Sequence, residues 1–153
     1  SEAGCLVKSG GDDVFLQSDG CLRSVRPVRT APYPGFPTDA QPVLMAALLQ
    51  SEGSTVFVEN IFENRYRHVD ELARMGADVR VAGRVAVVTG RERLHGAHVK
   101  CTDLRAGAAL VIAGLQASGL TRVSRIEHID RGYESIERDL SALGAHIRRE
   151  TGT

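Results

Sequence analysis

The sequence predicts an α/β protein with an unusual layer order, in which apolar helices are buried inside and sheets face the solvent. Two observations support this prediction. An internal repeat alternates strands with helices, and the most apolar segments of each repeat are helices and not strands. Layered α/β proteins more often bury parallel strands beneath amphipathic helices. The inverse pattern therefore indicates that the helices occupy the interior.

The repeat is found when the segment beginning at Thr38 is set beside the segment beginning at Thr102. The offset between matching residues drifts only from 64 to 68, as expected for a duplicated unit with small loop insertions. A third, partial copy of the unit's end lies 72 residues before its counterpart in the first repeat. The matches are Thr38-Asp39 with Thr102-Asp103, Gly53 and Thr55 with Gly119 and Thr121, Arg65 with Arg131, Leu72, Gly76 and Ala77 with Leu140, Gly144 and Ala145, and Gly4 and Val7 with Gly76 and Val79.

We therefore divide the chain into three parts of one domain. Residues 1–30 are the tail of a preceding repeat. Residues 31–95 form a repeat with the PGFPTD motif, and residues 96–153 form a repeat with the TDLR and HIDRGYE motifs.

Each repeat opens on an apolar helix. A Thr-Asp pair precedes both helices, and threonine is favoured at the N-cap, so we expect helices over roughly 39–51 and 103–117. The runs VLMAALL and ALVIAGL are apolar almost all round, which is typical of helices buried on every side. Gly53 and Gly119 are expected to end these helices.

A strand follows the apolar helix, and a hairpin ends the first repeat. The β-branched run 55–58 predicts the strand. Residues 78–81 and 85–89 flank Gly83-Arg84, which has the length of a two-residue hairpin turn. The unit therefore combines βα elements with a terminal hairpin.

A second helix lies between that strand and the end of each repeat. In the second repeat an apolar residue recurs every three or four positions, which predicts one apolar helix face beginning near Tyr133. Gly76 and Gly144 close the second helices, and a strand is expected after each. The residues of the apolar face are Tyr133, Ile136, Leu140 and Leu143.

The composition is that of an ordinary globular protein and excludes several partners. The 153 residues are 42% hydrophobic and 25% charged, which suffices for one compact domain. Nineteen basic residues balance nineteen acidic ones, so we expect no nucleic-acid partner and no attraction to an acidic membrane. The longest apolar runs, 43–49 and 106–115, are too short for a bilayer, which takes about 20 residues.

The N-terminus and the cysteines indicate a compartment. The N-terminus lacks the basic and apolar regions of a signal peptide. Cys5, Cys21 and Cys101 lack metal-type spacing and are expected to be free thiols in a reducing compartment, which predicts a cytoplasmic protein. Residues 3–7 resemble the end of a helix running into a strand with no helix before it, so we expect a fragment of a larger protein.

Asp39 and a set of arginines are the candidates for chemistry. In PGFPTD, Asp39 is either a helix-starting cap or a general base at the mouth of a helix. Arg105 lies in the first turn of its predicted helix, where the macrodipole disfavours a cation, and Arg65 and Arg131 precede the second helices. The arginines are either solvated, for example Arg131 paired with Glu134, or they converge with helix N-termini on an anion.

Other site types are not indicated. His95, His98 and Cys101 have no fourth ligand at a suitable spacing, so we expect no metal. The sequence has no GxxxxGK[ST] or GxGxxG phosphate loop and no GxSxG nucleophile elbow. We expect no cofactor.

Four long segments resemble one family. PYPGFPTDAQ (32–41), NIFENRYRHVDELARMGA (60–77), CTDLRAGAALVIAGL (101–115) and IEHIDRGYESIERDLSALGA (126–145) are similar to the UDP-N-acetylglucosamine 1-carboxyvinyltransferases. The related shikimate-pathway transferase does not resemble FENRYRHVDEL or HIDRGYE. The resemblance implies an inside-out α/β barrel with three repeats in each domain, of which this chain would hold an incomplete domain from the C-terminal part.

The resemblance also implies an activity. The family transfers enolpyruvyl from phosphoenolpyruvate to the 3′-hydroxyl of UDP-N-acetylglucosamine and releases phosphate, the first committed step of peptidoglycan synthesis. The family's base falls on Asp39, which would deprotonate the sugar hydroxyl, and two arginines would hold phosphoenolpyruvate. The implied substrate contacts are Asp39, Ile61, Asp103, Leu104, Arg105 and Arg131.

The family's catalytic Cys loop, phosphate-binding Lys and other substrate arginines lie outside this sequence. We therefore expect the remainder of the same enzyme as a partner, and an inactive isolated chain. Three hypotheses remain open: a partial enolpyruvyl transferase, a nucleotide-sugar-binding half-domain, and a structural fragment with no function of its own.

Overall fold

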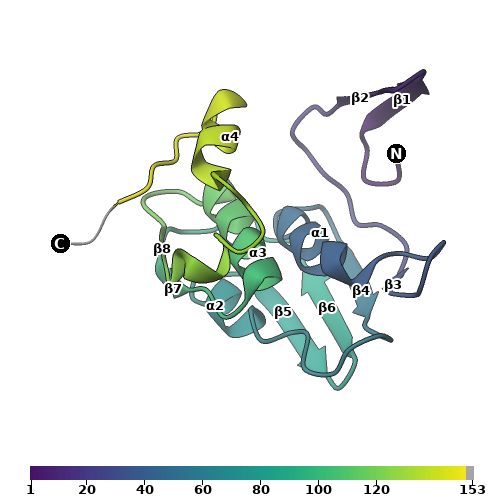
Figure 1. The fold of residues 1–153 in the computed structure, drawn as a ribbon. Helices are drawn as coiled ribbons and strands as arrows, with labels where there is room; N and C mark the ends of the chain where they lie inside the picture. Colours follow the sequence, from purple (N-terminus) through teal and green to yellow (C-terminus); the bar gives the residue numbers. More distant parts are fainter. Residues whose placement is uncertain (151–153) are drawn as a thin grey trace.

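The computed structural model describes residues 1–150, and Figure 1 shows the order of its elements. Helices and strands alternate along most of the chain, as the α/β prediction requires. The strands are β1 (Leu6–Gly10), β2 (Asp13–Gln17), β3 (Val28–Arg29), β4 (Ser54–Val58), β5 (Asp78–Ala82), β6 (Val85–Thr89), β7 (His98–Lys100) and β8 (Arg122–Ser124). The helices are α1 (Gln41–Ala47), α2 (Val69–Ala73), α3 (Leu104–Gln116) and α4 (Ile136–Ala142), with the 3-10 helices η1 (Thr38–Ala40) and η2 (Ile126–His128).

The strands of residues 1–150 form three separate sheets. The largest has the order β3-β4-β6-β5, with β3 parallel to β4 and the other two pairs antiparallel. β7 and β8 form a second parallel pair, and β1 and β2 form an isolated hairpin. These sheets do not close into a barrel. β3 lies before residue 31 but pairs with β4 of the first repeat, and the division into repeats stays a prediction.

The two apolar helices form the centre of the molecule. α1 and α3 lie side by side, with the four-stranded sheet on one side of them (Figure 1). Seven of the residues between 106 and 113 of α3 are buried. Met45 and Ala46 of α1 are fully buried in the core to which α3 also contributes. Phe57 of β4 and Leu72 of α2 belong to that core as well. The prediction that the apolar helices lie inside is confirmed for both repeats. No helix in the described part of the chain has the length and apolar character needed to cross a bilayer.

The start of the first apolar helix differs from the prediction. Thr38 and Asp39 form η1, and α1 begins only at Gln41, without a side-chain cap. The Thr38 hydroxyl donates to Glu59 Oε2 at 3.0 Å and does not cap a helix. As an N-cap, the Thr38 oxygen would accept a hydrogen bond from a backbone N–H. Here the hydroxyl is instead oriented by its own donation to the Glu59 carboxylate, a strong charged acceptor.

The second apolar helix, α3, begins one residue later than predicted. Asp103, and not Thr102, is the N-cap of α3. Its Oδ1 accepts hydrogen bonds from the backbone N–H groups of Arg105 and Ala106, each at 3.0 Å. A negative charge at this position also interacts favourably with the helix dipole, which explains why the carboxylate takes the cap in place of the hydroxyl.

The last helix, α4, is shorter than predicted. It begins three residues after Tyr133 and ends before Leu143, which is 84% exposed. Its residues Ile136 and Leu140 pack against a small apolar cluster, so only the middle of the predicted apolar face is used. The strand expected after this helix is not formed within 145–150. Its counterpart β5 is held by pairing with β6, and the described part of the second repeat offers no such neighbour.

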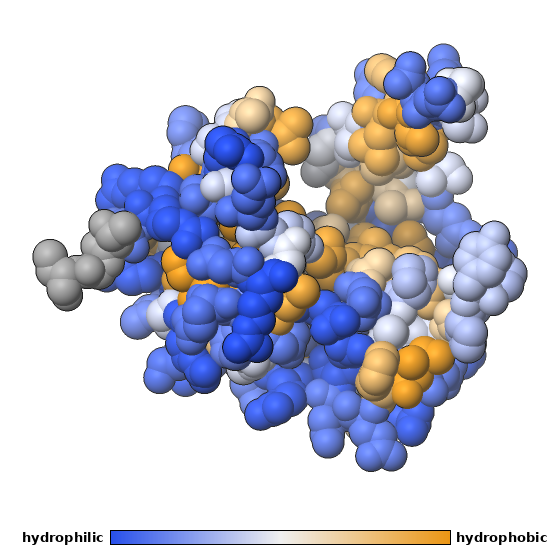
Figure 2. Space-filling model, viewed as in Figure 1, coloured by the Kyte–Doolittle hydropathy of each residue, from blue (hydrophilic) through white to orange (hydrophobic). Residues whose placement is uncertain are grey.

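The N-terminal hairpin has the geometry of the hairpin that ends the first repeat. Both pair two five-residue strands across a two-residue turn that opens on a glycine with a left-handed backbone, φ 60° at Gly11 and φ 58° at Gly83. The hairpin stands apart from the body (Figure 1). Val14 and Leu16 are 72% and 63% exposed, whereas their counterparts on β6 are buried. Figure 2 shows the apolar side chains gathered on this hairpin.

Substitution of Gly107 in α3 provides a test of how closely the central helix is packed. A Cβ at this position would lie 2.5 Å from both Cys101 Sγ and Ile129 Cγ1. Alanine inside a helix is otherwise favoured over glycine by about 1 kcal/mol, but overpacking a core typically costs about 1–3 kcal/mol. We expect Gly107→Ala to lower the free energy of unfolding, measured by urea denaturation followed by circular dichroism.

Gly114→Ala, in the same helix, is the matched control. A Cβ there would lie 3.2 Å from Cγ2 of Thr121, a half-buried side chain with room to move. We expect this substitution to leave the free energy of unfolding unchanged or to raise it by up to about 1 kcal/mol. Equal effects of the two substitutions would contradict the tight contact at Gly107.

Candidate functional site

Asp39 lies at the point where the PGFPTD turn meets the first central helix. The turn is closed by hydrogen bonds from Ala31 N to Phe36 O (3.0 Å) and from Gly35 N to Pro32 O (2.8 Å). Glycine is required at position 35, because a Cβ there would lie 2.5 Å from the Cβ of Ala31. The turn leaves the Asp39 side chain 59% exposed and free of any capping bond to its own helix.

Arg105 binds the Asp39 carboxylate through two N–H groups. Its Nε donates to Oδ1, and its Nη2 donates to Oδ2 at 3.0 Å. The partners are 66 residues apart, and the packing of α1 against α3 brings them together. Arg105 lies in the first turn of α3, as predicted, where the helix dipole disfavours a cation. The paired carboxylate offsets that cost.

A second arginine, Arg65, approaches the same carboxylate. Its Nη2 lies 3.8 Å from Asp39 Oδ1, and its guanidinium lies over the Phe62 ring, 4.5 Å from the centroid. The side chain is only 13% exposed, and its Nε has no hydrogen-bond partner within residues 1–150. A buried donor without an acceptor is costly, so an anion beside Arg65 would be stabilised.

The two aspartates at the helix starts have different roles, although they occupy matching positions of the repeat. Asp103 uses its carboxylate to cap α3. Asp39 caps nothing and faces two arginines. A matching position in the repeat therefore does not give the two aspartates the same role.

The arginines shift the pKa of Asp39 downward. The hydrogen bonds from Arg105 are the largest cause, partial burial opposes them, and the charge of Arg65 adds to the decrease from the ordinary value of 3.8. The same bonds raise the pKa of Arg105 above its ordinary value. At neutral pH the site therefore contains an ionised carboxylate and charged arginines.

A pocket of about 380 Å³ adjoins the ion pair. It is lined by the loop 62–65 together with Asp103 and Arg105. Asn64 in this loop has a left-handed backbone, φ 54°, which asparagine tolerates better than most residues. The pocket has the volume of a small-ligand site, and two of its lining side chains are arginines.

Two of the predicted contacts flank this pocket. Ile61 immediately precedes the loop and is 37% exposed. Leu104 is the first residue of α3 and packs against Gly132, where a Cβ would lie 2.6 Å from Leu104 Cδ2. This contact places the Asp-Arg-Gly segment that contains Arg131 next to the start of α3.

Arg131 itself is not joined to the ion pair. Within residues 1–150, no ion pair connects Arg131 with Asp39 or with Glu134, so the Arg131–Glu134 pair, named as an example of the solvated alternative, is not formed. The structure instead brings Arg65 to the carboxylate, a residue that was not among the predicted contacts. The available signal was the repeat, which matches Arg65 with Arg131.

The cysteines and histidines are the remaining side chains with metal-binding or nucleophilic chemistry. Among the residues that the structure describes, no three His, Cys, Asp or Glu side chains cluster as metal ligands would. Cys5, Cys21 and Cys101 are free thiols. Burial raises the pKa of Cys101 to about 11, so this thiol is protonated and unreactive at neutral pH.

The fold is shared with enolpyruvyl transferases of known structure. The crystal structure of the enolpyruvyl transferase NikO from Streptomyces tendae matches with a TM-score of 0.87 and 32% identity, over 99% of this chain and 35% of that chain. EPSP synthase from Acinetobacter baumannii matches with a TM-score of 0.70 over 97% of this chain. Its 18% identity supports the fold alone.

Residues 1–140 match the family model of EPSP synthase (3-phosphoshikimate 1-carboxyvinyltransferase), and the chain belongs to this family. It is similar to the UDP-N-acetylglucosamine 1-carboxyvinyltransferase of Myxococcus xanthus (53% identity, 97% of this chain, 35% of the relative). The corresponding relative from Clostridium acetobutylicum is 52% identical, with the same two shares. The chain therefore spans about a third of the length of these two relatives.

The ion pair predicts how the pKa of Asp39 responds to substitution. Arg105→Ala removes the largest cause of the decrease, so we expect the pKa to rise toward the ordinary value of 3.8, measured by carbon-13 NMR of the carboxyl group. The pKa of Asp39 is lower in the folded chain than in the unfolded chain, so the ion pair stabilises the fold at a pH above the pKa of the unfolded chain. This stabilisation is lost as the pH falls through the pKa of the folded chain.

Arg91→Ala is the control for this measurement. Arg91 is also a partly exposed arginine, and it pairs with Asp78 at 3.0 Å, away from the site. We expect it to leave the pKa of Asp39 unchanged. An Asp39 pKa that is the same in the parent chain and in Arg105→Ala would contradict the pairing.

Proposed function

We propose that this chain supplies part of the active site of an enzyme that transfers enolpyruvyl from phosphoenolpyruvate to the 3′-hydroxyl of UDP-N-acetylglucosamine. The observation that carries the proposal is the convergence of Arg105 and Arg65 on the exposed carboxylate of Asp39. The names of the relatives support the choice of substrates. A role in peptidoglycan synthesis and a cytoplasmic location belong to the same proposal.

Asp39 acts as the general base in this proposal. A sugar hydroxyl is too weak an acid for a carboxylate to ionise outright, so the carboxylate helps only while the new C–O bond forms. In the addition step the hydroxyl proton passes to Asp39, and a general acid outside this chain protonates the methylene carbon of phosphoenolpyruvate, which gives a tetrahedral phospho-ketal. Elimination then removes a proton from the new methyl group and releases phosphate, so that the C=C bond forms again. Asp103 and Leu104 line the site, and Ile61 contacts the UDP-sugar.

The arginines bind the anionic substrate. A planar guanidinium can bind either a carboxylate or a phosphate through two hydrogen bonds, so Arg105, Arg65 and Arg131 suit phosphoenolpyruvate. The arginine contacts also suggest how the base becomes active. When the substrate anion takes Arg105, Asp39 loses its strongest partner and gains a negative neighbour, and both effects raise its pKa. Substrate binding would thus increase the basicity of Asp39 at the step that needs it.

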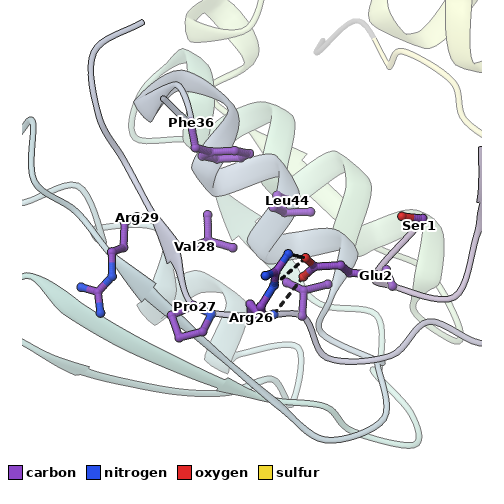
Figure 3. Close-up of a pocket in the computed structure, with 10 residues that line it drawn as sticks. Ser1, Glu2, Arg26, Pro27, Val28, Arg29, Phe36 and Leu44 are labelled. Atoms are coloured by element: carbon purple, nitrogen blue, oxygen red, sulfur yellow. Dashed lines mark hydrogen bonds and ion pairs between the residues drawn. The ribbon is translucent and has the colours of Figure 1, made fainter. Parts of the chain in front are cut away.

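We also propose that the remainder of the same enzyme completes the fold and the site. In the first repeat, β4 and the helices cover the β5–β6 hairpin, and the matching β1–β2 hairpin lacks such a cover within residues 1–150. A groove of about 850 Å³ lies between the N-terminal segment and α1. Figure 3 shows Val28, Phe36 and Leu44 at this groove, beside the hydrogen-bonded pair of Arg26 and Glu2. These apolar surfaces support a closed inside-out barrel formed with a further repeat.

Mixing the chain with its missing counterpart tests the proposal. The isolated chain is expected to release no phosphate from phosphoenolpyruvate and UDP-N-acetylglucosamine. Because the family's catalytic Cys loop lies outside it, fosfomycin is expected to alkylate none of its cysteines, as judged by intact mass. Adding the part of the Myxococcus xanthus relative that this chain does not cover should restore phosphate release.

Asp39→Asn is the matched variant in that mixture. It preserves the size of the side chain and removes the base, so the restored rate should fall by about 10²–10⁴-fold. Calorimetric binding of UDP-N-acetylglucosamine without restored activity would favour the nucleotide-sugar-binding half-domain. The absence of both binding and rescue would favour a structural fragment. Phosphate release by the chain alone would contradict the proposal that its site is incomplete.

A further inference from the structure

A buried carboxylate lies directly behind the site. Glu59 follows the last residue of β4 and is 1% exposed. Burying an ionised carboxylate costs several kcal/mol unless hydrogen bonds compensate, so a residue of this kind is retained only where its surroundings satisfy it. No arginine, lysine or histidine forms an ion pair with Glu59 within residues 1–150.

Four hydrogen bonds satisfy Glu59. Its Oε1 accepts from Thr30 Oγ1 at 2.9 Å, from Ile61 N at 2.9 Å and from Phe62 N at 3.0 Å. Its Oε2 accepts from Thr38 Oγ1 at 3.0 Å. Burial acts to raise the pKa of Glu59, but the two backbone amides and the two hydroxyls together outweigh it, so the pKa lies below the ordinary value of 4.5. The carboxylate is therefore ionised at neutral pH.

Three of the four donors come from the two segments that form the site. Thr38 immediately precedes Asp39. Ile61 and Phe62 begin the loop that carries Arg65, and the guanidinium of Arg65 stacks over the Phe62 ring. A single carboxylate thus connects the segment that holds the base with the loop that holds an arginine.

The second repeat shows that the repeat fold does not itself require this carboxylate. The residue at the matching position, 66 residues later, is Arg125. Arg125 is exposed, has a left-handed backbone with φ 60°, and pairs with Glu127 at 3.4 Å. The buried carboxylate is thus present in the repeat that carries Asp39 and absent from the repeat in which Asp103 only caps a helix.

We propose that Glu59 is a positioning residue, which holds Asp39 and the Arg65 loop in register through its hydrogen bonds to Thr38, Ile61 and Phe62. The inference rests on the proposed function, because it assigns Glu59 to the same site. Glu59 touches no reacting atom. It acts by fixing Thr38 next to Asp39 and the start of the loop that carries Arg65.

Substitution of Thr38 tests the connection without removing the buried charge. Thr38→Val preserves the shape of the side chain and removes the donor, whereas Thr38→Ser preserves the donor. In Thr38→Val we expect the carboxyl pKa of Asp39, followed by carbon-13 NMR, to rise toward its ordinary value, because Asp39 is no longer held against Arg105. In Thr38→Ser we expect the pKa of the parent chain.

A second measurement follows the other side of the connection. Glu59→Gln preserves the shape of the side chain and removes the charge, so the amide proton resonances of Ile61 and Phe62 should move upfield as their acceptor weakens. The backbone resonances of α3 should stay in place, which shows that the fold is intact. Unchanged amide resonances would contradict the role of Glu59 in holding the loop.

An Asp39 pKa that is identical in Thr38→Val, Thr38→Ser and the parent chain would overturn the proposal. These readouts need no enzymatic activity, so a failure of the proposed function would leave them interpretable. In the mixture with the complementary part of the enzyme, Thr38→Val should lower kcat more than it changes KM. Thr38→Ser should have the kcat of the parent chain. A change confined to KM would also overturn the positioning role.

Discussion

The site depends on the packing of two apolar helices against each other. Asp39 belongs to the segment that opens α1, and Arg105 belongs to the first turn of α3, so their contact exists only while the helices lie side by side. α3 also packs closely against Cys101 and Ile129, where Gly107 has no side chain to obstruct them. Core packing and site geometry are therefore the same constraint.

The two arginines have two effects on Asp39. They keep its carboxylate ionised, and because they lower its pKa they also make it a weak base. Arg105 is in turn disfavoured by the dipole of its own helix and favoured by the carboxylate. In the proposed function, the substrate anion replaces Asp39 as the partner of Arg105, so the ion pair occupies the arginine only until the substrate binds.

Local signals were sufficient to predict much of the fold. The β5–β6 hairpin and the two apolar helices depend on turn residues and periodicity within a few positions, and the structure has them close to where they were expected. Contacts between distant segments could not be predicted in this way. The hydroxyl of Thr38 bonds a carboxylate 21 residues away, and Arg65 reaches the site through a loop. The predicted strand after Gly144 needed a neighbouring strand that residues 145–150 do not have.

The separation of Asp39 from Arg105 along the chain has a consequence for synthesis on the ribosome. Translation proceeds from the N-terminus, so the aspartate is made 66 residues before the arginine that binds it. Until the segment that carries Arg105 has emerged and docked, the carboxylate lacks the hydrogen bonds that are the largest cause of its lowered pKa. The ion pair therefore reports on completed docking of the two repeats, and a nascent chain does not present it.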